Sequence, residues 1–471
     1  MRLARAGAAL LTLVLVFPAG VTAASTAVVL SGSTPRAFSP NGDGHADVLG
    51  LTVTLSSAGP LLVTVRSFEG ATVATLRDEP VAAGVSALSW DGAGLPDGPY
   101  TVVATIADAT ATLAIAIWRT MPSVRRPGKI VVTLDPGHGG TETGTSAWLD
   151  DGGRLFEKQV NLDTALKTGA MLEAGGYIVR YTRTTDINRT LAQRTAYANA
   201  VRSDALIGVH FNQISLARGR TEAFYCGAGC YGAASSRSLA QYVLASHRQR
   251  LSAYETATFK LTPSPDLGWQ AMDDYDRWFG KSDCRGTIGC HFGLLGPYSS
   301  TFRPTAATMP AILMESLAFS SPDELALIVD PAVRTQIAVA YADGIGRFFA
   351  TRSAWVRQEL AAPLPILRRY RASSIKIQVT NTGARAIPAG SYIVVGDRSR
   401  TNANSPGTIK GTSIGTRKLT LPLAPGASTR VWVRVVPKTG GRRTWKVDFV
   451  LGGVRLSDRR LPALLIHAYV R

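Results

Sequence analysis

Four side chains in the middle of the chain are of the types that hold and use a metal ion. They are His138, Glu157, His210 and Glu315. His138 stands in a glycine-rich turn, Asp135-Pro-Gly-His-Gly-Gly140, which directly follows an apolar run typical of a buried strand. His210 and Glu315 each follow a further apolar run, and Glu157 precedes a helix expected to start near residue 161. Because ligands bind at the carboxyl ends of strands in open α/β sheets, we expect the four side chains to meet in one crevice.

Two imidazoles and one carboxylate are a typical ligand set for a catalytic zinc ion, which keeps a fourth position for water. Zinc lowers the pKa of that water from 15.7 to about 7, and a further carboxylate can take up its proton and pass it on. The pattern therefore predicts metal-assisted hydrolysis of an amide or ester. Taken singly, each residue also has an ordinary structural explanation; a helix N-terminus, for instance, favours a carboxylate such as Glu157 without any catalysis.

The segment 129–360 is expected to form a domain in which strands alternate with helices. The expected strands are 129–134, 177–181, 205–209, 221–225 and 311–314. The expected helices are 161–173, 191–201, 235–249 and 331–349. This alternation predicts a three-layer α/β domain, a mixed sheet flanked by helices.

With these motifs in order, residues 129–350 resemble the zinc-dependent N-acetylmuramoyl-L-alanine amidases of the AmiC and LytC type. The motifs that carry the resemblance are Asp135-Pro-Gly-His138-Gly-Gly140, Glu157-Lys-Gln-Val-Asn161, Arg183, Arg194, His210-Phe-Asn212 and Pro310-Ala-Ile-Leu-Met-Glu315. The resemblance implies that His138, Glu157 and His210 bind zinc and that Glu315 is the catalytic carboxylate. It also implies hydrolysis of the amide bond between N-acetylmuramic acid and L-alanine of the peptidoglycan stem peptide. One departure is Gly208, which stands where such enzymes often have serine.

Residues 27–118 contain short β-rich runs separated by Gly, Pro and Asp turns, which predict a β-sandwich. The stretch 38–47, with Trp90-Asp-Gly92 further on, resembles the immunoglobulin-like domain of flagellar hook-capping proteins. Asn41, Asp43 and Asp47 have the oxygens that calcium prefers, or else they form a turn held by side-chain hydrogen bonds. A linker is expected over residues 119–128.

Residues 366–471 again alternate short strands with turns and predict a second immunoglobulin-like β-sandwich, after a boundary near residues 361–365. From residue 368 onward there are 20 Lys and Arg but only 3 Asp and Glu, so nearly all of the net charge of +18 lies there. This basic domain is expected to face anionic polymers of the cell wall, beside the peptidoglycan substrate, or else to be a solvated basic surface. Nucleic acid is not expected as a partner, because the sequence also predicts export.

Residues 1–24 predict a secretory signal peptide, in which two arginines precede the apolar run 8–17 and small residues follow. We therefore expect a protein secreted to the extracellular space, cell wall or periplasm, with no transmembrane segment. The segment 226–310 could line or cover the substrate groove; it holds an Asp- and aromatic-rich stretch at 269–278 and His291, expected at the surface. The four cysteines favour local disulfides over a zinc site, because their spacing departs from that of zinc ligands; they are Cys226, Cys230, Cys284 and Cys290.

Two other functions fit part of this pattern. A zinc peptidase acting on stem peptides would use the same ligand set, and an inactive wall-binding scaffold would keep the fold alone. The presence of all four chemical residues argues against the scaffold, and the order of the motifs favours the amidase. The sequence has no Gly-x-Ser-x-Gly elbow and no phosphate-binding or dinucleotide-binding glycine motif, which argues against a serine hydrolase and a nucleotide enzyme.

Overall fold

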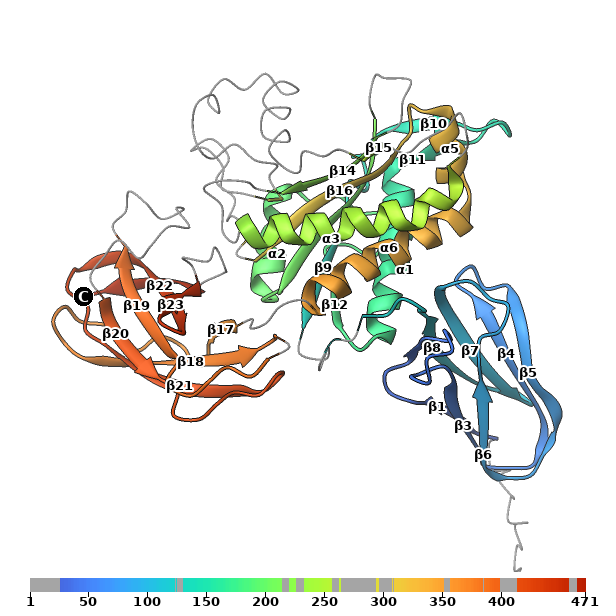
Figure 1. Cartoon of the computed structure of the whole chain (residues 1–471), viewed down its shortest axis with the longest axis horizontal. Coiled ribbons are helices and arrows are strands. Elements are labelled where there is room, and N and C mark those ends of the chain that lie inside the picture. The colour runs from blue at the N-terminus through green and yellow to red at the C-terminus, as the bar shows by residue number, and fades with distance from the viewer. Residues whose placement is uncertain are drawn as a thin grey trace, which may run out of the picture.

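The chain forms a β-sheet domain, an α/β domain and a second β-sheet domain in sequence order (Figure 1). The computed structural model describes residues 26–122, 124, 130–213, 220–225, 233–255, 262–263, 294–295, 307, 309–350, 356–383, 385–398, 413–456 and 464–471. The predicted signal peptide, the four cysteines, the stretch 269–278 and His291 lie outside these residues.

A six-stranded mixed sheet of order β12-β9-β13-β16-β14-β15 forms the centre of the middle domain. Its strands are β12 (Ile178–Tyr181), β9 (Val131–Pro136), β13 (Ala205–Asn212), β16 (Ala311–Ala318), β14 (Arg220–Tyr225) and β15 (Thr262–Pro263). The first four strands of the order are parallel, and β14 is antiparallel to β16. The central strands are buried along nearly their whole length, as expected for a sheet covered on both faces. The predicted α/β domain is thus confirmed.

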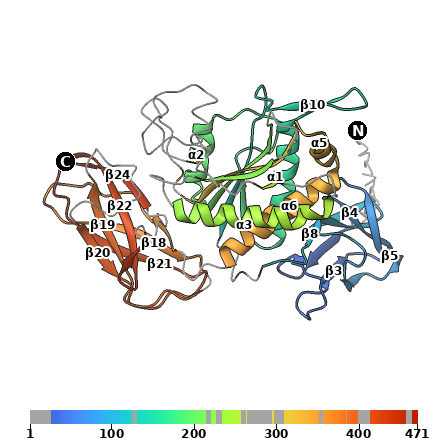
Figure 2. The same ribbon diagram turned by 45° about the horizontal axis from the view of Figure 1, so that its top comes forward.

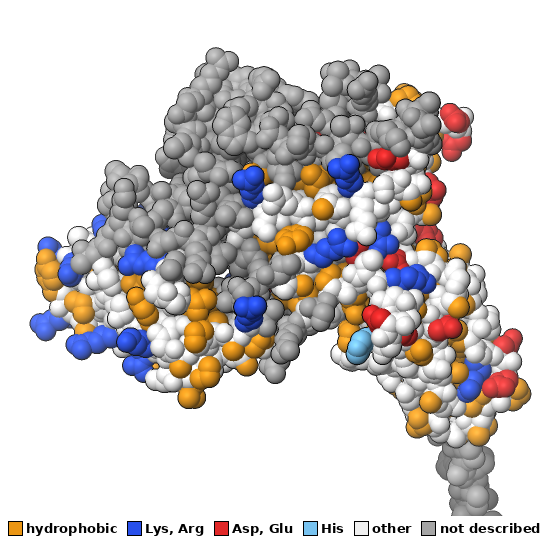
Figure 3. Space-filling model, in the orientation of Figure 1, with side chains coloured by type: hydrophobic (Ala, Val, Ile, Leu, Met, Phe, Trp, Pro, Cys, Tyr) orange, Lys and Arg blue, Asp and Glu red, His pale blue; other side chains and the backbone are white. Residues whose placement is uncertain are grey.

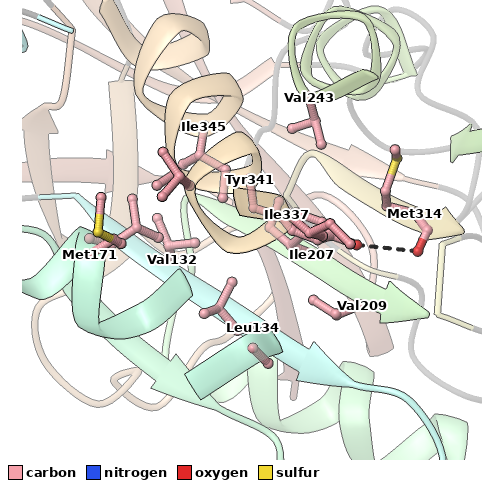
Figure 4. Packing of buried hydrophobic residues seen from close by; sticks show 14 of the residues in the cluster. Val132, Leu134, Met171, Ile207, Val209, Val243, Met314, Ile337, Tyr341 and Ile345 are labelled. Atoms are coloured by element: carbon pink, nitrogen blue, oxygen red, sulfur yellow. Dashed lines mark hydrogen bonds between the residues drawn. The ribbon is translucent and has the colours of Figure 1, made fainter. Parts of the chain in front are cut away.

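Helices cover the two faces of this sheet unequally (Figures 1 and 2). The helices are α1 (Glu157–Ala174), α2 (Leu191–Ala200), α3 (Ala233–Leu251), α5 (Pro322–Val329) and α6 (Pro331–Ala350), with a 3-10 turn at Ser252–Tyr254. α1, α3 and α6 share one core with alternate strand residues such as Ile207 and Val209 (Figure 4). In this core Tyr341 of α6 donates a hydrogen bond to the Met314 carbonyl at 3.3 Å. Leu206 instead belongs to the core of the opposite face, which includes α2.

Several elements of the middle domain differ from the prediction. β13 runs on to Asn212 and β16 to Ala318, because the two strands keep pairing past their polar residues: His210 lies in register with Glu315, and a bulge follows. The helix α1 begins at Glu157 rather than near residue 161. The Gln159 side chain accepts a hydrogen bond from the Phe156 N–H, which caps the helix one turn earlier than expected. The helix α5 and the hairpin of β10 (Ser146–Trp148) and β11 (Arg154–Phe156) were not predicted.

Among the described residues, no single helix has the length and apolar composition needed to cross a membrane. The helices α5 and α6 meet the criteria of length and apolar composition only when they are counted as one segment, and the chain bends by 88° between them. Most of α6 is buried in the core of the middle domain.

Two sheets that share one core make up the N-terminal domain. One sheet has the order β1-β3-β6, with strands Val28–Gly32, Leu49–Leu55 and Gly84–Trp90. The other has the order β2-β8-β7-β4-β5, with strands Ala37–Phe38, Ala109–Ile117, Gly98–Ile106, Gly59–Ser67 and Thr72–Val81. Alternate residues of β3 point into the shared core, as the period of two in a half-buried strand requires.

The N-terminal domain is packed against the helices of the middle domain. Trp118, directly after β8, is fully buried in the core of the middle domain and donates a hydrogen bond from Nε1 to Asp343 of α6 at 2.7 Å. Arg250 of α3 binds Asp343 at 3.0 Å and Asp97 of the N-terminal domain at 2.8 Å. Thr120, in the predicted linker, also donates to Asp343, so the linker begins as packed chain.

The C-terminal domain likewise has two sheets around one core. One has the order β17-β18-β21, with strands Val356–Leu360, Ser373–Asn381 and Ser428–Val435. The other has the order β20-β19-β22-β23, with β24 also on β22; these strands are Ser413–Lys418, Tyr392–Arg398, Gly441–Leu451, Val454–Arg455 and Leu464–Val470. β17 pairs with β18, so residues 356–360 lie in this sheet and not in the α/β domain where the sequence placed them. The pairing partner is β18, the next strand along the chain, so β17 is the first strand of the C-terminal domain.

Candidate metal centre

The turn that carries His138 is held in an uncommon backbone conformation by buried cations. His138 has a φ of 59°, a left-handed conformation that a side-chain-bearing residue seldom adopts. Arg183 donates hydrogen bonds to the carbonyls of Pro136 at 3.0 Å and Gly137 at 2.7 Å. Arg194 donates to Pro136 and to the His138 carbonyl, both at 2.8 Å. These guanidinium groups fix the carbonyls of the turn and so fix where the His138 imidazole points.

Lys158 anchors the far end of the same turn. Its Nζ donates a hydrogen bond to the Gly140 carbonyl at 2.8 Å and pairs with Asp186 at 2.6 Å. Asp186 in turn accepts a hydrogen bond from the Gly140 N–H at 2.7 Å. The turn is therefore held from both sides before any ligand binds.

Glu157 joins the two histidines. Its Oε2 lies 3.1 Å from His138 Nε2, and its Oε1 lies 3.0 Å from His210 Nδ1. As the first residue of α1, Glu157 is 4% exposed and reaches the carboxyl end of β13. The Asn161 side chain and the Phe211 N–H donate further hydrogen bonds to Oε1 at 3.1 and 3.3 Å. One carboxylate thus lies at the centre of the predicted ligand set.

The electrostatics of the cluster keep this carboxylate charged. Burial raises the pKa of Glu157, but hydrogen bonds from His138 and His210 outweigh it and hold the pKa far below its usual range. Burial lowers the pKa of His210, and the neighbouring Glu157 offsets this only in part. A charged carboxylate beside a neutral imidazole is the protonation state in which both groups bind a metal ion.

Two glycines make room for this cluster. A Cβ atom on Gly137 would collide with the His210 ring. A Cβ atom on Gly144 would collide with Glu157 Oε2 and the His138 ring, and Gly144 also has a φ of +67°. Both glycines are therefore part of the site's shape, because no other residue lets the backbone approach the side chains so closely.

The arrangement fits a zinc ion. The ligand atoms of His138, Glu157 and His210 all lie within 4.8 Å of one another. A tetrahedral ion with bonds of about 2.0–2.1 Å keeps its ligand atoms roughly 3.3 Å apart. The spacing of His138 Nε2 and Glu157 Oε2, 3.1 Å, is close to this, and His210 Nδ1 lies 3.0 Å from the other oxygen of the same carboxylate. Two imidazoles and a carboxylate from rigid elements form an open set of three ligands, and such a set leaves a coordination position for water.

Glu315 lies beside this cluster on the same face of the sheet. It is in register with His210 on the parallel strand β13, and its Oε2 is buried without a hydrogen-bond partner in the described structure. Burial, and then the charges of Glu157 and Glu222, raise the pKa of Glu315 well above its ordinary value. A raised pKa makes a carboxylate a stronger proton acceptor, and carboxyl groups in such surroundings are candidates for a functional role.

Glu222 is a site residue that the sequence did not single out. It pairs directly across from Glu315 on the antiparallel strand β14 and is 8% exposed. Its Oε2 accepts a hydrogen bond from the Asn212 side chain at 3.2 Å. The one available signal was its position in the expected strand 221–225, next to apolar residues, where a buried carboxylate is costly.

Other predicted features have ordinary surroundings. Gly208 faces Leu294, whose Cδ2 would lie 2.7 Å from an added Cβ, so a larger residue would displace this leucine. Asp47 accepts hydrogen bonds from the N–H groups of Asn41, Gly42 and Gly44 at 3.0, 2.8 and 2.7 Å. Those bonds are the ones that the interpretation as a turn held by side-chain hydrogen bonds predicts.

The fold and the cluster together define a mixed-sheet α/β domain with a His–Glu–His cluster that could hold a metal ion at the carboxyl ends of its strands. Residues 132–347 match the family model described as N-acetylmuramoyl-L-alanine amidase. This match is limited to the middle of the chain and agrees with the resemblance found in the sequence.

Relatives with this name each match about half of the chain. The amidase AmiC of Neisseria meningitidis serogroup B is 29% identical over 241 residues, which are 48% of this chain and 54% of that protein. The amidase AmiA of Salmonella typhimurium is 29% identical over 253 residues, 50% of this chain and 83% of that protein. The solved structure of the amidase AmiC2 of Nostoc punctiforme is 23% identical and covers 47% of this chain and 97% of its own, with a TM-score of 0.34. The chain thus spans about half the length of the Neisseria relative.

Proposed function

We propose that this protein is a zinc-dependent peptidoglycan hydrolase that cleaves the amide bond between N-acetylmuramic acid and the L-alanine of the stem peptide. The observation that carries the proposal is the His138–Glu157–His210 cluster, with Glu315 in register beside it, inside a domain of the amidase family. Relatives that share this domain are named for this activity.

In this proposal His138, Glu157 and His210 are the zinc ligands. A bound zinc ion would supply a Lewis acid and an activated water at neutral pH. The chain's own contribution is positioning: Arg183 and Arg194 hold the turn of His138, and the N-terminal end of α1 places Glu157. Because hydrogen bonds hold the backbone of His138 and the carboxylate of Glu157 in place, these two ligands need little rearrangement to bind the ion.

Glu315 is the proposed proton carrier. Its unpartnered Oε2 is free to accept a hydrogen bond from the attacking water. The carboxylate takes one proton from that water and gives it to the amide nitrogen as the carbon–nitrogen bond breaks, so that the peptide leaves with a neutral amine. Its raised pKa favours retention of the proton between these two steps.

The remaining parts of the proposal concern location and the flanking domains. We assign the two flanking sheet pairs to the immunoglobulin-like class and the N-terminal segment to a cleaved signal peptide. The enzyme would then act outside the cytoplasm, where peptidoglycan lies. The basic C-terminal domain would bind anionic polymers of the wall.

The decisive experiment is mass spectrometry of peptidoglycan after incubation with the zinc-loaded protein, residues 25–471. We expect free stem peptides with an L-alanine amino terminus. Glu315→Gln should lower the rate about 10²–10⁴-fold, as expected for loss of a general acid–base group. His138→Ala should lose both zinc and activity, whereas the control His45→Ala, at an exposed histidine of the N-terminal domain, should lose neither.

Other products would contradict the proposal in distinct ways. Cleavage within the stem peptide would identify a zinc peptidase. A protein that binds zinc but releases no peptide from purified peptidoglycan would count against the activity, and one that binds no zinc would be a scaffold.

A further inference from the structure

The outer face of one sheet of the C-terminal domain combines cations with an exposed aromatic ring. Along β21 the side chains alternate, with Val433 and Val435 buried in the core and Trp432 54% exposed on the other side. We call the outward side chains of β18 and β21 the β18–β21 face; they are Ser374, Lys376, Gln378, Arg430, Trp432 and Arg434. This face carries three cations and no acidic residue.

The strand register places cations around the indole of Trp432. Lys376 on β18 lies directly opposite Trp432, and its Nζ is 5.2 Å from the ring centroid. Arg430 and Arg434 occupy the outward positions on either side of Trp432 along β21. Since alternate residues of a strand are about 6.6–6.8 Å apart, the two guanidinium groups are attached about 13 Å from each other with the indole between them.

The cations of the face have no acidic partner within the described structure. No ion pair of Lys376, Arg430 or Arg434 occurs there, and Arg430 instead donates a hydrogen bond to Gln378 Oε1 at 3.2 Å. Gln378 donates in turn to Glu359 on β17 at 3.4 Å, and Glu359 pairs with Arg202 of the middle domain at 3.5 Å. A chain of polar contacts therefore connects the face to the middle domain.

The chemistry of the face fits an anionic glycan. Guanidinium and ammonium groups bind phosphate or carboxylate, and a flat indole offers an apolar surface to a sugar ring. Serine and glutamine side chains on the same face can bond hydroxyl groups. A protein partner would need an apolar interface centre, which one exposed ring does not supply. Figure 3 shows that Lys and Arg side chains gather on this domain while Asp and Glu cluster elsewhere on the visible surface.

We propose that the β18–β21 face is the binding site for an anionic polysaccharide, with Trp432 stacked on a sugar ring and Lys376, Arg430 and Arg434 on the acidic groups. The inference rests on the proposed function for its choice of a wall polymer, and it assigns that binding to one face instead of to the overall charge of the domain. Binding there would hold the amidase domain beside the wall.

The test is co-sedimentation of the full chain with insoluble cell walls that retain their anionic polymers, and with the same walls after hydrofluoric acid has removed phosphodiester-linked polymers. All variants carry Glu315→Gln, so that the walls stay intact. The triple variant Lys376→Gln, Arg430→Gln and Arg434→Gln should weaken binding about tenfold or more, since charge-assisted hydrogen bonds are lost. Trp432→Ala should weaken it about 2–10-fold.

A charge-matched control separates the face from the general charge. The triple variant Arg417→Gln, Lys418→Gln and Arg442→Gln removes three exposed cations of the other sheet and should change binding less than threefold. All variants should keep the unfolding midpoint of the parent, because the changed side chains point outward. Soluble polygalacturonate and polyphosphate serve as competitors that distinguish recognition of carboxylate from recognition of phosphate. We expect one of them to displace the protein from the walls.

Several results would overturn the inference. If both triple variants lost the same amount of wall binding, binding would depend on the overall charge of the domain and not on this face. If Trp432→Ala bound the walls as tightly as the parent, Trp432 would not stack on a sugar ring. Failure of both soluble polyanions to compete, or tighter binding of duplex DNA than of either, would exclude an anionic glycan. Hydrolysis of a soluble muramyl peptide by the triple variant in its catalytically intact form is measured separately, so loss of the proposed activity and loss of this binding site are distinguishable.

Discussion

Arg250 is the residue through which the N-terminal domain and the amidase domain are most directly coupled. Its guanidinium group binds Asp97 of the N-terminal domain, Asp343 of α6 and the Thr120 hydroxyl, at 2.8, 3.0 and 2.5 Å. Burial lowers the pKa of Arg250, but the two carboxylates outweigh it and the pKa is raised. Replacing this residue should therefore loosen the contact between the two domains.

The expected loss of stability depends on which partners the two carboxylates keep after Arg250 is replaced. Removing one partner of a buried ion pair costs about 3–5 kcal/mol, because the remaining charge is left uncompensated. In Arg250→Gln, however, Asp97 keeps its pair with Arg119 at 2.9 Å and Asp343 keeps the Trp118 indole at 2.7 Å. We therefore expect Arg250→Gln to lower the free energy of unfolding by about 3 kcal/mol, the lower end of this range.

Denaturant unfolding of the full chain measures the free energy, and amide hydrogen exchange localises the effect. Exchange should speed up in residues 118–122 and at the C-terminal end of α3, while β13 and β16 stay protected. Arg248→Gln, at an exposed arginine on the same helix, is the matched control and should cost less than about 0.5 kcal/mol. If Arg250→Gln were no more destabilising than this control, the carboxylates would not depend on the guanidinium and the coupling argument would fail.

Three further predictions concern the metal centre and the core. Gly144→Ala should bind much less zinc by elemental analysis, because its Cβ would collide with Glu157, whereas Gly152→Ala, also at positive φ but in open space, should cost only about 1–2 kcal/mol of stability and keep the metal. Removing zinc with a chelator should lower the thermal midpoint and abolish hydrolysis, and zinc alone should restore both; restoration by magnesium instead would contradict the ligand assignment. Burial raises the pKa of Glu324 from 4.5 to about 7, so as pH rises from 4.5 to 7 the unfolded state loses a proton that the folded state keeps, and stability falls. Glu324→Gln should therefore match the parent at pH 4 and exceed it by up to about 3 kcal/mol at pH 8; an equal gain at both pH values would refute the titration.

Most of the middle domain could be predicted from the sequence, because its strands are buried and therefore apolar. The runs before His138, His210 and Glu315 are visible without a structure, since a strand covered on both faces cannot contain many polar residues. Placing the side chains at strand ends then follows from the parallel order of an α/β sheet. The structure brings all four together, and His138, Glu157 and His210 form one cluster.

The features that could not be predicted from the sequence depend on strand register and on contacts between distant segments. Glu222 faces Glu315 only because β14 is antiparallel to β16 with one particular pairing, and a one-residue slip would turn it to the other face. Lys167 is fully buried yet pairs with Glu69 of the N-terminal domain at 2.8 Å, across nearly a hundred residues of sequence. No periodic pattern within either segment encodes such a contact.

Two contacts of the flanking domains with the middle domain lie away from the His138–Glu157–His210 cluster. Trp118 packs against Gly175, just after the C-terminal end of α1, while Glu157 begins the same helix. A helix of 18 residues is about 27 Å long, so this contact lies roughly that far from the metal centre. On the other side, Arg357 of β17 pairs with Asp204, which precedes β13, whereas His210 lies near the carboxyl end of that strand. Within the described part of the chain the flanking domains therefore contact the middle domain away from the His138–Glu157–His210 cluster, and the proposed function requires that end of the sheet to be open to substrate.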